Sequence, residues 1–252
     1  MENTHTKIYF ASDFHLGTPN FEESLVRERK IVAWLNSVRK DATEIYLMGD
    51  LFDFWFEYKY TVPKGFTRFL GTIASIVDSG IPVHFFLGNH DMWMFDYFPQ
   101  ELGVTIHKKE GIFHLGNKFF FLGHGDGLGP GDLNYKRIKK VFSNRFSQWL
   151  FARIHPNFSF GIANGWSRSS RKKGKEPQVF LGEDKEWLVA YCKRKLEEKP
   201  QIDFFLFGHR HLPISHKISE NSTYINTGDW LNHFTYAVFD GENLELKKIG
   251  EE

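Results

Sequence analysis

One pattern recurs along the chain: a short apolar run, a small residue, and then a side chain that can bind a metal ion. In the stretch Glu44–Asp50 the apolar run ends at Met48, and Gly49 and Asp50 follow. Such a run is typical of a buried strand, and glycine lets the chain turn tightly where the strand ends. The same order of residue types returns in residues 8–15, 83–91, 119–126 and 204–211. Open α/β folds bind ligands at the carboxyl ends of their strands, so these stretches predict a site at a sheet edge.

Between these stretches the residue pattern alternates between strand and helix. Helical spacing covers Asn20–Lys40 and Gly65–Ser79, and Asn20 can cap the first helix together with Glu23. Strands that alternate with helices predict a βαβ core with right-handed crossovers. Residues 112–122 instead predict a hairpin that turns at Gly116 and Asn117. We therefore expect an α/β fold with a second, more antiparallel sheet, which is completed by residues 223–226, 236–239 and 244–249.

A basic helical segment interrupts this alternation. Helical spacing runs through Tyr135–Ile154, with large apolar side chains on one side and six lysines and arginines over much of the rest. A short basic and polar run, Ser167–Lys175, follows it. We interpret residues 132–182 as a helical insertion, or cap, within a single domain of residues 1–252. A helix that packs on the core with a solvated charged face, followed by a loop, would give the same pattern, and the sequence leaves both interpretations open.

The composition excludes several classes of protein. The formal net charge is +1, so no overall positive field points to nucleic acid as a partner. The single cysteine, Cys192, excludes an internal disulfide framework and is typical of a reducing compartment. No apolar stretch is long enough to span a bilayer, and the N-terminus lacks the apolar region of a signal peptide. We therefore expect a cytoplasmic protein, with contact to a membrane surface left open and no indication of its oligomeric state.

The polar residues at the predicted strand ends offer oxygen and nitrogen donors to metal ions. They are Asp13, His15, Asp50, Asn89, His90, His124, His209 and His211. Carboxylate, imidazole and amide groups suit divalent ions such as Mn, Fe, Co or Zn, and the lack of cysteine in the set argues against a structural zinc finger. There are enough donors for two ions, and two neighbouring cations need a bridging carboxylate, for which Asp50 is the candidate. Such a pair makes hydroxide available near neutral pH and promotes hydrolysis of a phosphate ester or anhydride.

In combination these motifs resemble the calcineurin-like metallophosphoesterases, from Lys7 to about Trp230. The matching motifs are Asp13-x-His15, Gly49-Asp50, Gly88-Asn89-His90-Asp91, Gly123-His124 and Gly208-His209-x-His211. The resemblance implies a two-sheet sandwich flanked by helices and two divalent ions, with Mn²⁺ expected first and Fe, Co or Zn as alternatives. It implies that one ion is held by Asp13, His15, Asp50 and His211, and the other by Asp50, Asn89, His124 and His209. It also implies a catalytic role for His90, which would stabilise the transition state or help the leaving group to depart.

Within that superfamily the chain is most similar to the UDP-2,3-diacylglucosamine hydrolases of lipid A synthesis. This resemblance rests on residues 49–55, on the motif at residues 124–126, on Asp132 and Tyr135, and on the helical insertion with its basic run. It implies that Asp132 and Ser167 contact the glucosamine and uridine parts of the substrate. It also implies that Tyr135 and the basic residues contact the substrate, the latter near the diphosphate; these are Arg171, Lys172, Lys173 and Lys175. At His90 the chain departs from these enzymes, which usually have arginine there.

The expected reaction is hydrolysis of the pyrophosphate of UDP-2,3-diacylglucosamine to UMP and 2,3-diacylglucosamine 1-phosphate, by hydroxide that two metal ions activate. The expected partners are this lipid-linked nucleotide sugar and the cytoplasmic face of the inner membrane. Two alternatives stay open. One is a metallophosphodiesterase or nucleotide pyrophosphatase with a soluble substrate, and the other is a non-catalytic scaffold of the same fold. The complete set of donors beside His90 argues against the scaffold.

The sequence gives nearby carboxylates no single role. Asp53 and Asp126 can orient the histidines that bind metal, or they can serve in turns. Asp229, in the stretch Asn226–Trp230, is interpreted as structural rather than catalytic.

Overall fold

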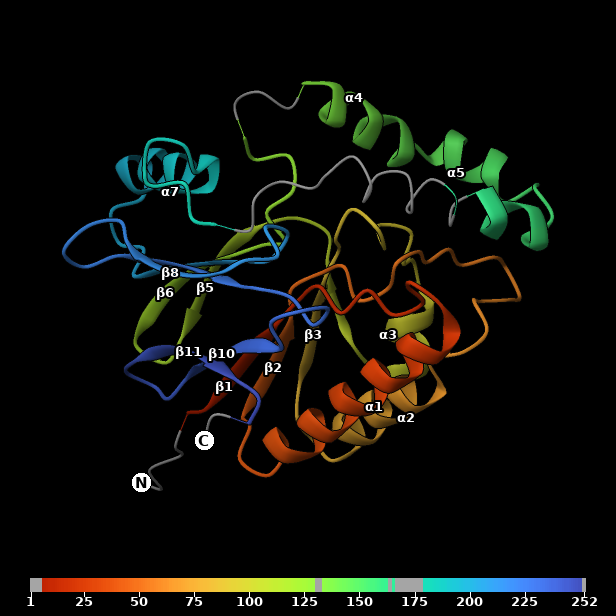
Figure 1. Cartoon of the computed structure of the whole chain (residues 1–252), viewed down its shortest axis with the longest axis horizontal. Helices are drawn as coiled ribbons and strands as arrows, with labels where there is room; N and C mark the ends of the chain where they lie inside the picture. The colour runs from red at the N-terminus through yellow and green to blue at the C-terminus, as the bar shows by residue number, and fades with distance from the viewer. Residues whose placement is uncertain (1–5, 130–132, 163–164, 166–178, 251–252) are drawn as a thin grey trace.

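Two β-sheets pack face to face and are flanked by helices (Figure 1). The computed structural model describes residues 6–129, 133–162, 165 and 179–250. The first sheet has six strands in the order β11-β10-β1-β2-β3-β4. Its bounds are β1 (Ile8–Ala11), β2 (Glu44–Leu47), β3 (Val83–Phe86), β4 (Thr105–His107), β10 (Thr235–Phe239) and β11 (Leu244–Lys248). Strands β1 to β4 are parallel, as the alternation of strand and helix predicts.

The second sheet has five strands in the order β5-β6-β7-β9-β8. Its bounds are β5 (Gly111–Leu115), β6 (Lys118–Leu122), β7 (Phe204–Phe207), β8 (Pro213–Lys217) and β9 (Thr223–Thr227). The predicted hairpin is confirmed as β5 and β6. This sheet is mixed, because β6 and β9 both run parallel to β7 while the two outer pairs are antiparallel.

The assignment of the last two strands to the second sheet is wrong. Strand β10 pairs antiparallel with β1, and β11 pairs with β10, so both belong to the first sheet. All five residues of β10 are buried. Its side chains alternate, with Tyr236 and Val238 against the helices and Ala237 and Phe239 between the sheets. A strand that is buried on both faces carries no periodicity that shows which sheet it joins.

Four of the described helices lie on the outer faces of the two sheets (Figure 1). Helices α1 (Phe21–Val38), α2 (Thr67–Asp78) and α3 (Tyr97–Leu102) share one apolar core with the six-stranded sheet. Helix α7 (Trp187–Glu198) covers the five-stranded sheet. The predicted N-cap of the first helix is confirmed, because Oδ1 of Asn20 accepts a hydrogen bond from the backbone amide of Glu23 at 2.9 Å.

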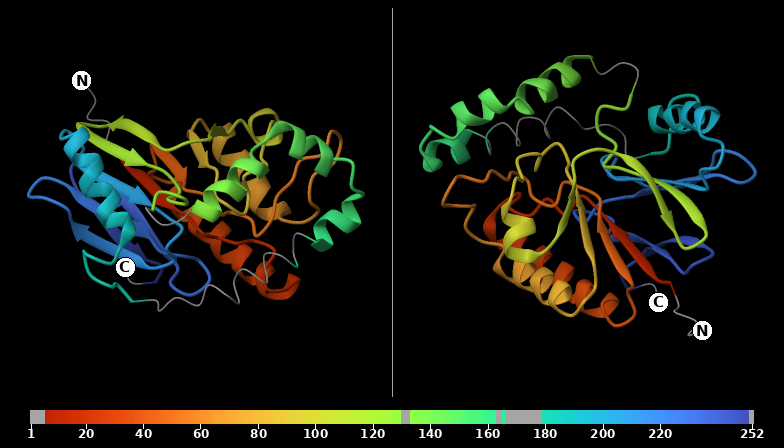
Figure 2. Two further views of the ribbon diagram at one scale, coloured as in Figure 1. Left: turned by 90° about the horizontal axis from the view of Figure 1, so that it is seen from above. Right: turned by 180° about the vertical axis from the view of Figure 1, so that it is seen from behind.

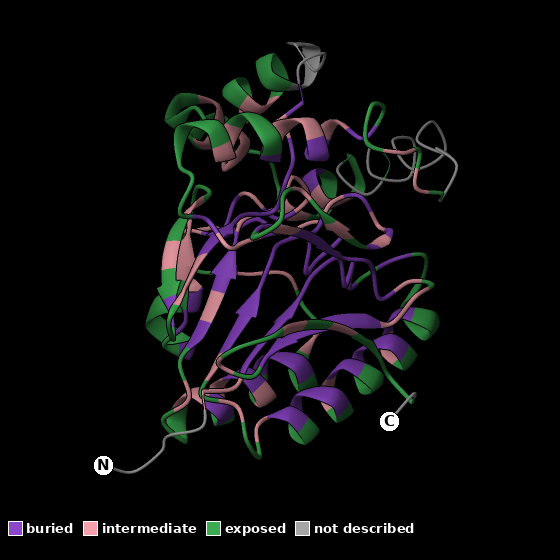
Figure 3. Ribbon diagram, turned by 90° about the vertical axis from the view of Figure 1, so that its left-hand side faces the viewer, coloured by how far each residue is buried: buried purple, intermediate pink, exposed green. Residues whose placement is uncertain are grey.

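The basic segment forms two helices where the sequence predicts one. Helix α4 (Leu133–Phe142) ends before Ser143, and α5 (Arg145–Phe151) begins after Asn144. The side chain of Asn144 accepts the amide of Phe146 at 2.8 Å, so it caps a new helix instead of continuing the old one. Both helices lie over the loops that follow the strands (Figure 2), and none of the residues of α5 is buried (Figure 3).

Aromatic side chains fill much of the space between the two sheets. Phe10 in β1 stacks on Tyr46 of β2 at 5.3 Å between ring centroids, and on Phe120 of β6 at 5.8 Å. Phe120 in turn meets Phe239 of β10 at 5.0 Å. These rings fix how the two sheets sit on each other, and therefore where their strand ends meet.

Replacing Phe10 tests whether this aromatic layer holds the sheets together. Its side chain is 0% exposed, so Phe10→Ala leaves a cavity between the sheets. We expect the free energy of unfolding, measured by urea denaturation, to fall by about 3–5 kcal/mol. The control is Phe21→Ala, because the ring of Phe21 is 69% exposed. Its loss should change the free energy of unfolding by less than about 0.5 kcal/mol. Equal effects of the two changes would contradict a dominant role for the inter-sheet layer.

Candidate metal centre

Four predicted metal ligands meet beyond the carboxyl ends of β1, β2 and β7. Asp13, His15, Asp50 and His211 each place one donor atom within 4.8 Å of the others. Nε2 of His211 lies 3.3 Å from Oδ1 of Asp13 and 3.3 Å from Nε2 of His15. A metal–nitrogen bond is about 2.0–2.1 Å long, so one ion can reach both imidazoles. The first group therefore has the composition and spacing of a site for one divalent cation.

A second group shares Asp50 with the first. Asp50, His124 and His209 place donor atoms within 4.8 Å of one another. Nε2 of His124 lies 3.3 Å from Oδ2 of Asp50 and 3.3 Å from the side-chain oxygen of Asn89, just beyond β3. The structure thus brings together every residue that the sequence predicts as a metal ligand, in two groups with one residue in common.

The two oxygens of Asp50 differ in their contacts. Oδ1 accepts the backbone amide of His90 at 2.9 Å, which fixes the carboxylate in place. Oδ2 lies 3.3 Å from Nε2 of His124 in the second group and 3.8 Å from Nε2 of His15 in the first. Asp50 therefore belongs to both groups of donors, and one of its oxygens faces both.

Glycine precedes two of the motif residues because the backbones approach the carboxylates closely. A Cβ atom on Gly88 would collide with Oδ1 and the backbone nitrogen of Asp50. A Cβ atom on Gly208 would collide with the side chains of Ser12 and Asp13. At Gly88 and Gly208 the small residue is therefore more than a turn residue, since it makes room for a carboxylate that follows another strand.

The backbone at the site adopts a conformation that side chains rarely allow. The described residues include seven non-glycine positions with positive φ. Five of these belong to the two groups: Asp13, His15, Asp50, His209 and His211. The left-handed region costs roughly 1–2 kcal/mol per residue, because Cβ crowds the following carbonyl oxygen. Such strain concentrates at functional sites, where the surrounding structure holds it in place.

The electrostatics of the two groups call for positive charge. Burial raises the pKa of Asp50, but the surrounding histidines, His124 first, outweigh burial and hold that pKa well below its usual value. Burial lowers the pKa of His124, but Asp50 outweighs it and raises that pKa to about 10. Oδ1 of Asp13 is buried and accepts no hydrogen bond from the described residues. A buried anion with an unused lone pair fits a metal ligand, because the ion would supply both the charge and the missing partner.

Hydrogen bonds behind the imidazoles set which nitrogen faces the site. Nδ1 of His124 donates to the Met48 carbonyl at 2.8 Å, and Nδ1 of His211 lies 3.3 Å from Oδ2 of Asp229. A carbonyl or carboxylate can only accept a hydrogen bond. In its neutral form each ring therefore carries its lone pair on Nε2, toward the proposed ions. Asp229 is fully buried, and the sequence alone predicts a structural rather than a catalytic role for it. Its position in a glycine-containing turn hides the role that its contact with His211 shows.

The two carboxylates whose roles the sequence leaves open also lie beside histidines. Oδ1 of Asp53 is 3.6 Å from Nδ1 of His15, behind the first group. Asp126 accepts a hydrogen bond from Lys139 of α4 at 2.6 Å, and its pKa is lowered because the charge of His124 outweighs burial. Asp53 is thus placed to orient a ligand, while Asp126 joins the loop of His124 to the helix above it.

A family comparison identifies the superfamily to which this site belongs. The calcineurin-like phosphoesterase family matches residues 6–213, which is most of the chain. The chain is a calcineurin-like phosphoesterase. Members of this family use a pair of divalent metal ions, and the two donor groups that share Asp50 fit that pair.

Full-length relatives narrow the comparison. The chain is 39% identical to the UDP-2,3-diacylglucosamine hydrolase of Porphyromonas gingivalis, over 97% of this chain and 98% of that protein. It is 29% identical to the enzyme of the same name from Actinobacillus succinogenes, over 89% and 92% of the two chains. The match to that of Photobacterium profundum is also 29%, over 96% and 97%. The resemblance inferred from the motifs is confirmed.

His90 stands beside both donor groups of this phosphoesterase without belonging to the pair that shares Asp50. Its ring meets that of His15 edge-on at 4.9 Å, and Nδ1 donates to the Asp53 carbonyl at 2.9 Å. Burial lowers the pKa of His90 to about 4, so the ring is neutral at neutral pH. A bound phosphoryl group would favour the protonated ring, since a negative charge nearby stabilises the charged form.

The predicted substrate contacts lie largely outside the described residues. Those outside are Asp132, Ser167, Arg171, Lys172, Lys173 and Lys175. Tyr135 lies within α4, although its side chain is not among those described.

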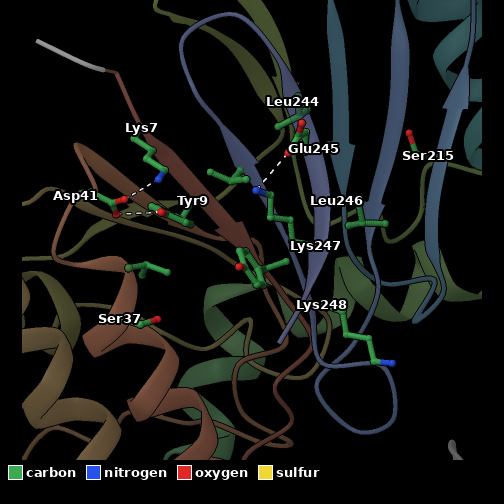
Figure 4. A pocket seen from close by; sticks show the side chains of 13 residues that line it. Lys7, Tyr9, Ser37, Asp41, Ser215, Leu244, Glu245, Leu246, Lys247 and Lys248 are labelled. Atoms are coloured by element: carbon green, nitrogen blue, oxygen red, sulfur yellow. Dashed lines mark hydrogen bonds and ion pairs between the residues drawn. The ribbon is translucent and has the colours of Figure 1, made fainter. Parts of the chain in front are cut away.

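An open groove elsewhere on the molecule is separate from this centre (Figure 4). It runs between β1, β10, β11 and the end of α1, and its lining contains none of the donor residues. Lys7 in the groove pairs with Asp41 at 2.6 Å, and Lys247 pairs with Glu245 at 3.2 Å. Two of the three lysines that line the groove are therefore paired with its two carboxylates, and the groove lacks a set of convergent metal-binding groups.

Replacing His90 separates catalysis from metal binding. We expect His90→Ala to lower kcat for a small activated phosphodiester by roughly 10²-fold, because the reacting phosphoryl group loses a proton or hydrogen-bond donor. The metal content of the purified protein, measured by elemental analysis, should stay the same. His114→Ala, a change at an exposed histidine of β5, is the matched control and should alter neither value. Parallel losses of metal and rate in the His90 variant would place His90 among the metal ligands instead.

Proposed function

We propose that this phosphoesterase hydrolyses the pyrophosphate of UDP-2,3-diacylglucosamine to UMP and 2,3-diacylglucosamine 1-phosphate. The observation that carries the proposal is the near full-length match, at 39% identity, to a UDP-2,3-diacylglucosamine hydrolase. The site supports it, because the complete donor set around Asp50 suits hydrolysis of a phosphoric anhydride.

The proposed cofactor is a pair of divalent ions, Mn²⁺ first. Asp13, His15, Asp50 and His211 would hold one, and the other would be held by Asp50, Asn89, His124 and His209. When bound, such a pair polarises the phosphoryl oxygens and provides hydroxide near neutral pH. Asp50 would offset the repulsion between the two cations, since its Oδ2 faces both groups of donors.

Within this reaction His90 would act on the phosphoryl group. Its backbone amide donates to Oδ1 of Asp50 at 2.9 Å, so its position is tied to that of the bridge. Its ring is oriented by the Asp53 carbonyl at 2.9 Å. Once protonated, a ring held in this way can donate a hydrogen bond from Nε2 to a phosphoryl oxygen or pass that proton to the leaving oxygen.

Aromatic side chains beside the site suit an acylated substrate. Phe54 directly follows Asp53, and its ring contacts Phe160 at 5.3 Å and Trp93 at 5.9 Å between centroids. From α5, Phe151 packs on Trp93 at 4.7 Å. Burying a methylene group contributes about 0.8 kcal/mol, so acyl chains that contact this cluster would contribute strongly to affinity. We propose that the acyl chains lie against this aromatic cluster, beneath the cap helices.

The large apolar side chains predicted for one side of the basic helix are divided between two sides. Phe142 and Phe151 contact Trp93, whereas Phe146 and Trp149 are 68% and 52% exposed. Phe158 and Ile162 add further exposed apolar surface, at 70% and 60%. The sequence of residues 133–162 has six lysines and arginines and no aspartate or glutamate.

We propose that the exposed side of the cap helices rests on an anionic membrane surface, at the cytoplasmic face where a lipid-linked substrate would reside. Exposed aromatic and aliphatic side chains with surrounding basic residues are the pattern of interfacial helices. Among the described residues no helix has the length and hydropathy needed to cross a bilayer. Attachment through α4, α5 and the residues that follow would hold the aromatic cluster close to the lipid.

The proposed substrate is tested by comparing three nucleotide substrates with the Mn²⁺-loaded enzyme. They are UDP-2,3-diacylglucosamine, UDP-N-acetylglucosamine and UDP. We expect kcat/KM for the acylated compound to exceed the others by at least about 10²-fold, as expected if several methylenes are buried. Release of UMP, followed by chromatography, is the measurement. Equal or higher activity on a soluble nucleotide would replace this proposal with the soluble-substrate pyrophosphatase.

The proposed membrane contact is tested by vesicle flotation of the intact protein. We expect Phe146→Asp with Phe158→Asp to weaken binding to vesicles that contain anionic phospholipid by about tenfold or more, because each change puts a charge where apolar surface would enter the interface. Hydrolysis of a small activated phosphodiester should be unchanged. Phe21→Asp is the matched control, since Phe21 is equally exposed but lies on α1. If wild-type protein does not float with these vesicles, the membrane proposal is wrong.

A further inference from the structure

A buried arginine separates the two histidines of the last motif. Arg210 is 9% exposed and lies between His209, in the second donor group, and His211, in the first. Both histidines have positive φ, at 65° and 54°. This short stretch of backbone therefore supplies a donor to each of the two proposed ions, and its geometry sets how far apart those donors lie.

The guanidinium of Arg210 makes a bidentate interaction with the carboxylate of Glu186. Its Nε donates to Oε2 of Glu186 at 3.3 Å, and Nη2 donates to Oε1 of the same carboxylate at 3.1 Å. Nη2 also donates to the carbonyl of Val179 at 3.3 Å. The two parallel hydrogen bonds to Glu186 fix the orientation of the guanidinium as well as its position. A lysine at this place would make a single contact and would leave the orientation free.

Glu186 is itself anchored to a rigid element. It is 2% exposed and immediately precedes α7. Leu188, Val189 and Cys192 of that helix are fully buried against the five-stranded sheet. The ring of Trp187, one residue on, faces the ring of His209 at 6.1 Å between centroids. The carboxylate that receives Arg210 therefore stands at a fixed point of the fold.

A buried ion pair is weak evidence for stability, because removing two charges from water costs about as much as their attraction returns. The effect of the Arg210–Glu186 pair is therefore expected in the geometry of the site, since Arg210 lies between two strained histidines that belong to different donor groups. We propose that Arg210 and Glu186 form a positioning pair that sets the orientation of His209 and His211, and hence the affinity and spacing of the two metal ions. This inference concerns the metal site on which the proposed function rests, but its test needs no substrate.

The test is a titration of metal-free protein with Mn²⁺ alone, using Arg210→Lys, Glu186→Gln and the double variant Arg210→Met with Glu186→Leu. The double variant leaves no unpaired buried charge, so its metal-free form should unfold at a temperature near that of the wild type. We expect its affinity for at least one ion to fall by about 10- to 100-fold, the usual effect of losing a group that orients a ligand. The electron paramagnetic resonance spectrum of the coupled Mn²⁺ pair should change. Arg210→Lys keeps the positive charge, so its Mn²⁺ affinity should lie between that of the wild type and that of the double variant.

The control is Arg39→Lys, which alters an arginine that joins the C-terminal end of α1 to α2 through the Ser75 carbonyl at 2.9 Å. It should leave the titration unchanged. Unaltered Mn²⁺ affinities and an unaltered spectrum in the double variant would overturn the proposal and leave the pair as a packing contact. Because catalysis is not measured, a wrong substrate would not affect either outcome.

Discussion

The charge of Asp50 is the constraint on which the rest of the site depends. One buried carboxylate lies between two groups of donors, with Oδ1 fixed by the His90 amide at 2.9 Å and Oδ2 facing both groups. An ionised group at 1% exposure has to be balanced by positive charge. Without metal, that balance comes from a proton on His124, whose pKa Asp50 raises to about 10 despite burial. A cation bound at Nε2 would take the place of that proton, so metal binding and proton release are coupled.

The fold delivers these donors by strain that the sheets can support. Each donor stands two to four residues past the end of a strand, where the chain turns inward. Five of them do so with a left-handed backbone, which costs roughly 1–2 kcal/mol per residue. The strands that precede them are buried and hydrogen-bonded on both sides, and Phe10 and Phe120 lock one sheet against the other. The strain persists because the strand ends cannot relax without opening this aromatic layer.

The sequence predicts the donors well because they carry their own chemistry. An apolar run followed by a small residue and then a side chain that can bind a metal ion is an unusual combination, and its five occurrences make the metal centre predictable. The glycines at 88 and 208 could be predicted as turns, but their role in making room for Asp50 and Asp13 depends on strands far apart in the chain. The sheet that β10 joins, and the break of the basic helix at Asn144, depend on pairing and capping choices that local periodicity does not encode.

The groups that orient the donors were harder to predict for a physical reason. A metal ligand must be one of a few side chains, whereas the group behind it need only accept a hydrogen bond or fill space. His124 is oriented by a backbone carbonyl, His211 by Asp229, and the loop of His209 is backed by Arg210 and Glu186. A carbonyl, a carboxylate in a turn and an ion pair share no sequence pattern. Relatives that keep the same donors can therefore differ in the layer behind them, and that layer can tune metal affinity and spacing without any change in the motifs.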